Sequence, residues 1–219
     1  MSDLKKYQDS IRNFVQALSE VKKVVNIQIA MEDLENLKRA MYRLCFAKKV
    51  GDNDYNVVWY SFFDYLSYNT FSWTPQYGLF GTTIFQDNIK VQVATNVVTI
   101  GLGETSILNS YGVLLNPTTG GPETCFTMDN EYGSIHPGVL QLSTGIDGQQ
   151  VSTPIYVAEA PIVKGRAELT PVEKVLVWFE QNIETSTMFS TARSNEVEID
   201  LTFQNTAAMK YENQTWKKI

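Results

Sequence analysis

The sequence predicts a mainly β protein, with an antiparallel β-sandwich body over residues 41–219 and an N-terminal amphipathic helical arm over residues 1–40. Three observations predict it: helical spacing of apolar residues near the start, alternating spacing after residue 41, and frequent turn sequences from there on. The chain has 219 residues, of which 43% are hydrophobic and 19% are charged. This composition is typical of a folded chain with its own core, and it excludes disordered and collagen-like classes.

Apolar residues in the first part of the arm recur at alternating steps of three and four, as on one face of an amphipathic helix. The spacing slips near Gln28, where Val25, Ile27 and Ile29 alternate with polar residues as in a short strand, and helical spacing resumes over residues 31–41. We expect both helices to cover the core of the body; the alternative is a helix-mediated dimer or trimer. The apolar face of the first helix consists of Leu4, Tyr7, Ile11, Phe14, Leu18, Val21 and Val25.

The body contains many short segments with strand-like alternation, separated by turns rich in Gly, Pro, Asn and Asp, which is typical of an antiparallel sandwich or barrel. One segment is ambiguous. Thr170, Pro171 and Glu173 have the spacing of a helix start, but the adjacent bulky residues 175–179 favour a strand buried on both faces, so we expect a strand. The other expected strands are 42–46, 55–62, 89–94, 97–102, 107–115, 124–128, 138–143, 155–158, 196–203 and 207–211.

Single residue types exclude several classes of site. The chain has one histidine, His136, and two cysteines, Cys45 and Cys125, which is too few for the common zinc sites. Residues 1–20 lack the apolar run of a secretory signal, and no stretch is apolar enough for a transmembrane helix, so we expect a cytoplasmic protein. In that reducing compartment we expect both thiols to be buried and unpaired.

Charge is distributed unevenly along the chain. Residues 1–50 carry ten Lys or Arg against six Asp or Glu, whereas residues 51–219 carry eight against eighteen. Between Gly51 and Val163 the only basic residue is Lys90, which excludes a nucleic-acid groove there because phosphates require Lys and Arg. A basic leading segment beside an acidic body favours docking on its own body or on a neighbour's, with an anionic membrane as the alternative.

Aromatic residues are concentrated between Tyr55 and Phe85, which contain twelve of the chain's twenty-six. Residues 65–80 are interspersed with Ser, Asn, Thr and Pro, so the sequence predicts a loop that exposes some of these rings. Exposed Tyr and Trp beside amides can stack on sugars, lie at a lipid headgroup layer or contact a protein, although the same rings could instead cover the core. The predicted ligand-binding residues are Tyr65, Tyr68, Asn69, Trp73, Gln76 and Tyr77.

A weak metal motif lies just before this stretch. Asp52, Asp54 and Asn56 place oxygen ligands at alternate positions, as calcium loops do, but the required glycine and the bidentate Glu are missing. A polar hairpin turn explains the same residues, so we expect no metal and no cofactor.

No motif in the sequence names a reaction. We therefore expect a non-enzymatic surface-recognition protein, lectin-like or cytolysin-like in defence, that binds a glycan or a membrane through its aromatic loop. The alternative is a self-assembling structural protein, held by contacts between a basic arm and an acidic body. A third possibility is a hydrolase that uses a pair of carboxylates. The body carries eighteen Asp or Glu, and the sequence does not show which two would form the pair.

Overall fold

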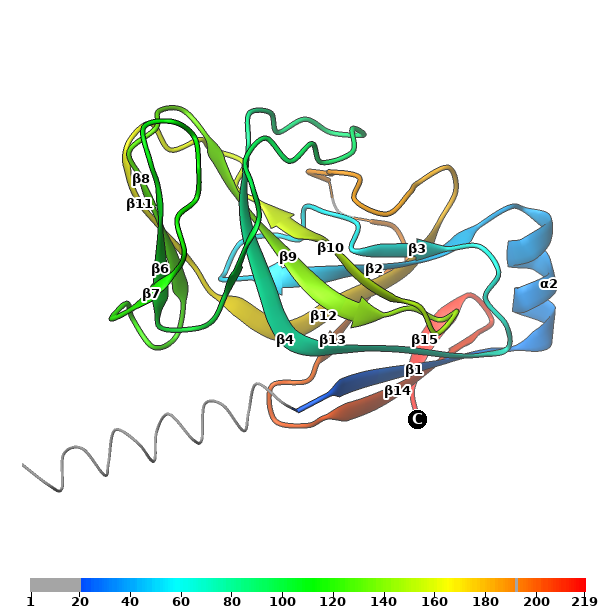
Figure 1. The fold of residues 1–219 in the computed structure, drawn as a ribbon. Helices are drawn as coiled ribbons and strands as arrows, with labels where there is room; N and C mark the ends of the chain where they lie inside the picture. The colour runs from blue at the N-terminus through cyan, green and yellow to red at the C-terminus, as the bar shows by residue number, and fades with distance from the viewer. Residues whose placement is uncertain (1–20, 192) are drawn as a thin grey trace, which may run out of the picture.

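The structure is a computed structural model that describes residues 21–191 and 193–219, and it is mainly β (Figure 1). We call its three sheets the large, back and end sheets. The large sheet contains β1 (Lys23–Ile29), β4 (Tyr68–Thr82), β5 (Val98–Ile100), β9 (His136–Thr144), β10 (Gln150–Val157), β14 (Thr206–Glu212) and β15 (Thr215–Lys218). Its strand order is β10-β9-β4-β1-β14-β15, with β5 paired to β4 beside this path.

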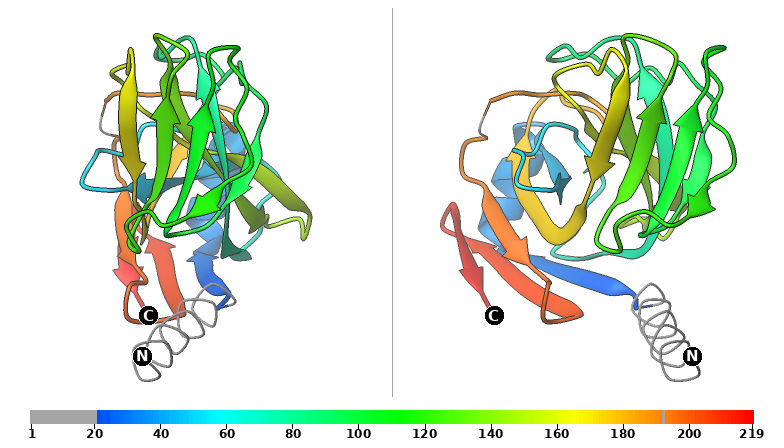
Figure 2. Two further views of the ribbon diagram at one scale, coloured as in Figure 1. Left: turned by 60° about the vertical axis from the view of Figure 1, so that its left-hand side comes forward. Right: turned by 90° about the vertical axis from the view of Figure 1, so that its left-hand side faces the viewer.

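The other two sheets have four strands each. The back sheet has the order β13-β12-β2-β3 and the end sheet the order β11-β8-β6-β7. Figure 2 shows the strands of the end sheet side by side. The back sheet consists of β2 (Arg43–Val50), β3 (Tyr60–Phe62), β12 (Pro171–Glu180) and β13 (Val197–Asp200), and the end sheet of β6 (Glu104–Leu108), β7 (Thr118–Thr119), β8 (Phe126–Asn130) and β11 (Gly165–Leu169).

The main core joins residues of all three sheets. Phe46 on β2 stacks on Phe71 of β4 with 4.4 Å between ring centroids, and Tyr77 of β4 contacts Phe126 of the end sheet. The opposite face of the back sheet is also covered, because Cys45 and Trp178 belong to a second apolar cluster. Aromatic side chains supply much of the buried area that stabilises such a core.

This covering of both faces explains the ambiguous segment. In β12, Val175, Val177 and Phe179 face the main core, while Leu176 and Trp178 face the second cluster. Five adjacent bulky residues therefore have apolar surroundings in a strand. The prediction of a strand in the ambiguous segment 171–183 is confirmed, with the observed bounds Pro171–Glu180.

The expected loop at 65–80 is wrong, because Tyr68–Thr82 form the fifteen-residue strand β4 between β1 and β9. The polar residues that indicated a loop are accommodated in two ways. Thr70 donates a hydrogen bond to Asn26 of the neighbouring strand, and the pairing with β9 shifts register between Trp73 and Tyr77, where Pro75 lies. Proline has no backbone N–H to donate to the neighbouring strand, and a bulge interrupts the ladder of hydrogen bonds at that position.

Other expectations are partly corrected. Residues 89–94 do not form a strand, most of 107–115 is irregular beyond Leu108, and 55–62 contributes only β3. Two strand pairs, β1 with β14 and β6 with β8, are parallel. Cys45 and Cys125 are buried and unpaired, as expected.

The first predicted helix spans Leu4 to Val25, and residues 1–20 are outside the described residues. Its predicted end is wrong, because residues 23–25 belong to strand β1. The second is confirmed as α2 (Met31–Arg39), and the slip near Gln28 corresponds to strand β1. Because β1 pairs with both β4 and β14, the chain joins the large sheet well before the expected boundary at residue 40. None of the helical structure in the described part has the length and apolar character that crossing a bilayer requires.

Candidate functional site

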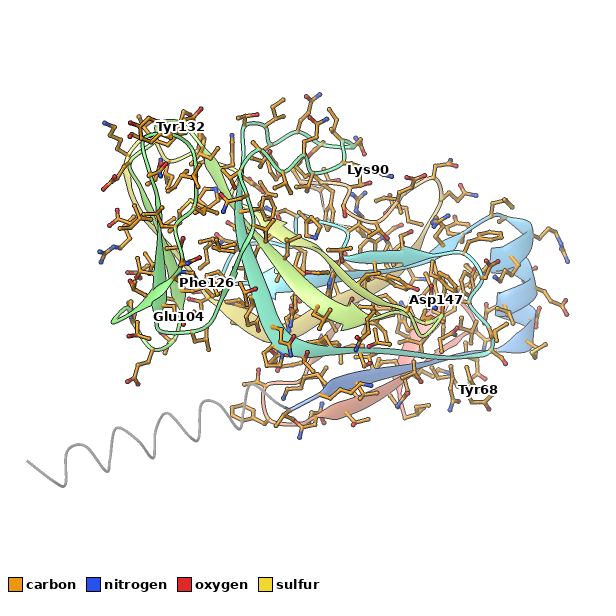
Figure 3. All side chains as sticks on the ribbon, in the orientation of Figure 1. Tyr68, Lys90, Glu104, Phe126, Tyr132 and Asp147 are labelled. Carbon is orange, nitrogen blue, oxygen red and sulfur yellow. The ribbon has the colours of Figure 1, made fainter. Side chains whose placement is uncertain are left out.

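The structure separates the six predicted ligand-binding residues. Tyr65, Asn69, Trp73 and Tyr77 are buried, whereas Tyr68 and Gln76 are exposed. Tyr68 is 72% exposed and lies at the surface (Figure 3). The expected recognition surface at 65–80 is therefore corrected, since one exposed ring on a central strand does not form it.

Trp73 has a structural role in a buried polar cluster. Its indole Nε1 donates to Glu173 Oε2 at 2.8 Å, and Lys48 Nζ binds the same oxygen at 2.8 Å while lying over the Trp73 ring. Burial lowers the pKa of Lys48 to about 8, although Glu173 acts in the opposite direction. The Lys48 side chain is fully buried and the Glu173 side chain is 20% exposed, so the cluster makes its polar contacts within the protein, between the large and back sheets.

The weak metal candidates do line one hollow of about 450 Å³, together with Glu159. Asn56, however, is buried, donates its amide to Val157 O and accepts from Val157 N, so its side chain serves the backbone. Among the described residues no group of three His, Cys, Asp or Glu side chains is arranged to hold a metal ion.

A more promising site lies where α2, the end of β12 and the β14–β15 hairpin meet (Figure 1). Two adjoining hollows, of about 360 and 430 Å³, share the lining residues Tyr42, Phe179 and Ser194. We call them together the α2 groove. Its other lining residues are Asp33, Asn36, Leu37, Ala40, Asn195, Tyr211 and Gln214 in the first hollow, and Trp178, Glu180, Gln181, Asn182 and Arg193 in the second.

Aromatic packing holds the walls of the groove. Phe179 stacks on Trp216 with centroids 5.5 Å apart and an angle of 5° between the ring planes, and it also contacts Tyr211. Tyr65 packs against Phe179 from the core side and donates its hydroxyl to Tyr42 O at 3.0 Å. Tyr65 therefore packs behind the wall of the groove. Through these contacts with Phe179 and Tyr42 it connects the predicted ligand-binding residues with the α2 groove.

The turn of the β14–β15 hairpin is fixed by α2. Asn213 and Gln214 form a two-residue turn with φ of 53° and 57°, the left-handed geometry that suits the twist of a hairpin. The carboxylate of Asp33 accepts hydrogen bonds from both of their backbone N–H groups, at 2.8 and 3.3 Å. This contact positions the Gln214 side chain at the rim of the groove.

Asn195 organises the other side. Its amide nitrogen donates to Tyr211 Oη at 2.8 Å and to Gln214 O at 2.9 Å, while its backbone oxygen accepts from Trp216 Nε1. Burial, with the nearby Asp33 carboxylate, raises the pKa of Tyr211, so its hydroxyl keeps its proton. Because that oxygen already accepts from Asn195, the proton is free to be donated into the groove.

The charged groups of the groove are engaged within the protein. Glu180 accepts from Trp178 Nε1 at 2.6 Å and from Arg193 Nη1 at 3.0 Å, and the Arg193 guanidinium lies over the Phe189 ring. Asp33 is occupied by the hairpin turn. The groups left to face a ligand are hydroxyls, amides and aromatic edges, which carry no net charge.

Sequence reasoning missed this site because its lining comes from four segments that no local motif connects. The turn signal at Ser194-Asn195 was visible in the sequence, but nothing in its neighbourhood indicated Tyr211 or Asn36 as companions. Comparisons of the chain with protein-family models, with curated proteins and with solved structures found no match. The function is therefore inferred from the geometry and chemistry of the groove.

Proposed function

We propose that the protein is a non-enzymatic, lectin-like recognition protein that binds an uncharged glycan in the α2 groove. The observation that carries this proposal is a hollow in which aromatic walls from Tyr42, Phe179 and Tyr211 meet the amides of Asn36, Asn195 and Gln214. Ligand sites of proteins have volumes of roughly 300–1,000 Å³ and combine apolar walls with a few convergent polar groups. Both hollows fall in that range.

The chemistry of the lining favours a sugar over an anion. A pyranose has an apolar face of C–H groups that packs on aromatic rings, and hydroxyls that both donate and accept. Tyr211 offers a donor, Asn195 Oδ1 an acceptor, and the exposed amides of Asn36 and Gln214 offer both. The carboxylates of Asp33 and Glu180 disfavour a phosphate or sulfate, since the one guanidinium present is paired.

The same carboxylates support binding without catalysis. A glycoside hydrolase needs one carboxyl group free to donate a proton and a second free to act as base or nucleophile. Asp33 and Glu180 each accept two hydrogen bonds from the protein, which favours the structural role of both.

The experiment is a binding screen of the full chain on immobilised neutral glycans, followed by calorimetric titration of the best ligand. The Asn36→Ala/Gln214→Ala variant should lose about tenfold or more in affinity, because each lost hydrogen bond to a ligand hydroxyl is worth roughly 1 kcal/mol. Both side chains are exposed, so thermal unfolding should not change. Gln76→Ala, an exposed amide on β4, is the matched control and should bind as the parent does. The proposal fails if no neutral glycan binds, or if the groove variant binds like the control.

The acidic surface of β13 favours self-assembly as a second candidate function. Glu196, Glu198 and Asp200 are exposed there, and residues 1–50 carry the excess of basic charge. In this proposal the basic excess of residues 1–50, which lies after residue 20 because residues 1–20 carry three Lys or Arg and three Asp or Glu, meets that surface on a neighbouring copy. Light scattering should then show association that weakens as salt is raised from 50 to 500 mM. A monomer at every salt concentration contradicts it.

A further inference from the structure

Three loops of the end sheet bring apolar side chains together at one end of the molecule. β6 and β8 are parallel, with Leu108 beside Asn130, and Gly165 at the start of β11 pairs with Asn130 from the other side. The loops 109–113, 131–134 and 162–164 therefore leave the same end of the sheet, where Figure 3 shows Tyr132. Helix α2, which lines the α2 groove, lies at the opposite side of the molecule from the end sheet in Figure 1.

The side chains at this end are exposed although they are apolar or aromatic. Tyr111 is 87% exposed, Val163 67%, Tyr132 48% and Val113 46%. We call these four residues the tyrosine tip. Isolated exposed apolar residues are ordinary, but a group of them drawn from three loops marks an interaction surface.

The tip is held in place by a buried asparagine. Asn130 is 2% exposed, and its amide nitrogen donates to the backbone oxygens of Gly133, Ile162 and Val163, while its Oδ1 accepts from Tyr132 N. The ring of Tyr132 lies against Gly112, where an added Cβ would come within 3.2 Å of it. The three loops are thus joined before any partner arrives, which lowers the ordering cost of binding.

We propose that the tyrosine tip docks the protein on the surface of a zwitterionic lipid bilayer. Tyrosine suits the headgroup layer because its ring is apolar and its hydroxyl remains in water, and Val113 and Val163 reach the acyl boundary. The charged side chains of these loops, Glu131 and Lys164, have opposite signs. The tip is therefore nearly neutral, which matches a zwitterionic surface better than an anionic one or a charged protein partner.

The test is co-sedimentation of the full chain with phosphatidylcholine vesicles. Tyr111→Ser/Val163→Ser should lower the bound-to-free ratio at least tenfold, because the apolar area that enters the lipid is removed. Phe203→Ser is the matched control: Phe203 is 99% exposed in the β13–β14 turn, outside the tip, and its loss should leave binding unchanged. Both variants change exposed side chains, and equal unfolding temperatures verify that they are folded.

Four outcomes overturn the proposal. Three concern lipid: no binding to phosphatidylcholine, equal loss in the Phe203→Ser control, or binding that requires phosphatidylserine and disappears with salt. The last result would assign the membrane contact to the basic first part of the chain. Self-association that the tip variant abolishes in the absence of lipid would assign the surface to a second copy instead. Glycan binding by the tip variant is measured in parallel and should be intact, which separates this proposal from that of the groove.

Discussion

Asn195 donates its side-chain amide to the hydroxyl of Tyr211 over 2.8 Å, and this bond joins the turn before β13 to the β14–β15 hairpin. Asn195 has φ of 53°, a left-handed conformation that asparagine adopts more readily than most residues. The residue therefore combines a backbone requirement with two side-chain hydrogen bonds that shape the α2 groove.

Two substitutions at this position separate these effects. Asn195→Gly keeps the left-handed backbone and should cost about 1 kcal/mol of unfolding free energy for the lost hydrogen bonds. Asn195→Ala should cost roughly 1 kcal/mol more, because alanine is strained at positive φ. Urea unfolding measures both values. Equal stabilities of the two variants would show that the backbone conformation of Asn195 contributes nothing.

Trp73 and Tyr68 should respond in opposite ways to truncation. Trp73 is 1% exposed, T-shaped against Trp59 and bonded to Glu173, so Trp73→Ala should destabilise the fold by about 3–5 kcal/mol. Tyr68→Ala should change stability by less than about 0.5 kcal/mol, since most substitutions of exposed residues stay within that range. Denaturant melts of both variants check this. A fold that tolerates Trp73→Ala without loss of stability contradicts the placement of that ring in the core.

These two residues also show what the sequence could and could not predict. Periodic spacing of apolar residues identified β1, α2, β9 and β13, because each has an apolar face that burial explains, whereas β12 was identified by five adjacent bulky residues that are buried on both faces. β4 was missed because Thr and Ser are as compatible with a strand as with a loop, and Pro75 is absorbed by a bulge that only tertiary pairing reveals. The α2 groove was missed because its residues meet through contacts such as Asp33 with Asn213, 180 positions apart.

Lys48 should make stability depend on pH in the alkaline range. Its pKa is lowered from 10.5 to about 8 by burial, against the opposing effect of Glu173 and with a smaller contribution from Lys23. Between about pH 8 and 10.5 the unfolded chain holds a proton that the folded chain has released, so raising the pH favours folding. Below about pH 8 the Lys48 amine is protonated in both the folded and the unfolded state, so it no longer makes the unfolding free energy depend on pH.

The Lys48→Met variant isolates the effect, because tyrosines and cysteines titrate in the same range in both proteins. The unfolding free energy of the parent minus that of Lys48→Met should increase from pH 8 to pH 10. Urea melts at half-unit intervals of pH provide the values. A difference that stays constant, or falls, over this range contradicts the low pKa of Lys48.

Cys45 should be inert until the protein unfolds. Burial raises the pKa of its thiol to about 12, and the side chain has no exposed surface. Since the thiolate is the reactive form, labelling by iodoacetamide at pH 8 should follow the fraction unfolded across a urea series. Mass spectrometry of the peptide that contains Cys45 measures it. Rapid labelling in the absence of urea would contradict the enclosure of β2 between two apolar clusters.

Binding of a neutral glycan in the α2 groove should be visible in the indole N–H signals of the four tryptophans during an NMR titration with the best glycan of the screen. Trp178 lines the groove and Trp216 bonds to Asn195 at its edge, whereas Trp59 and Trp73 lie in the core. The signals of Trp178 and Trp216 should shift in a saturable way while those of Trp59 and Trp73 stay in place. Saturable binding that leaves the Trp178 and Trp216 signals unmoved would contradict binding in the α2 groove.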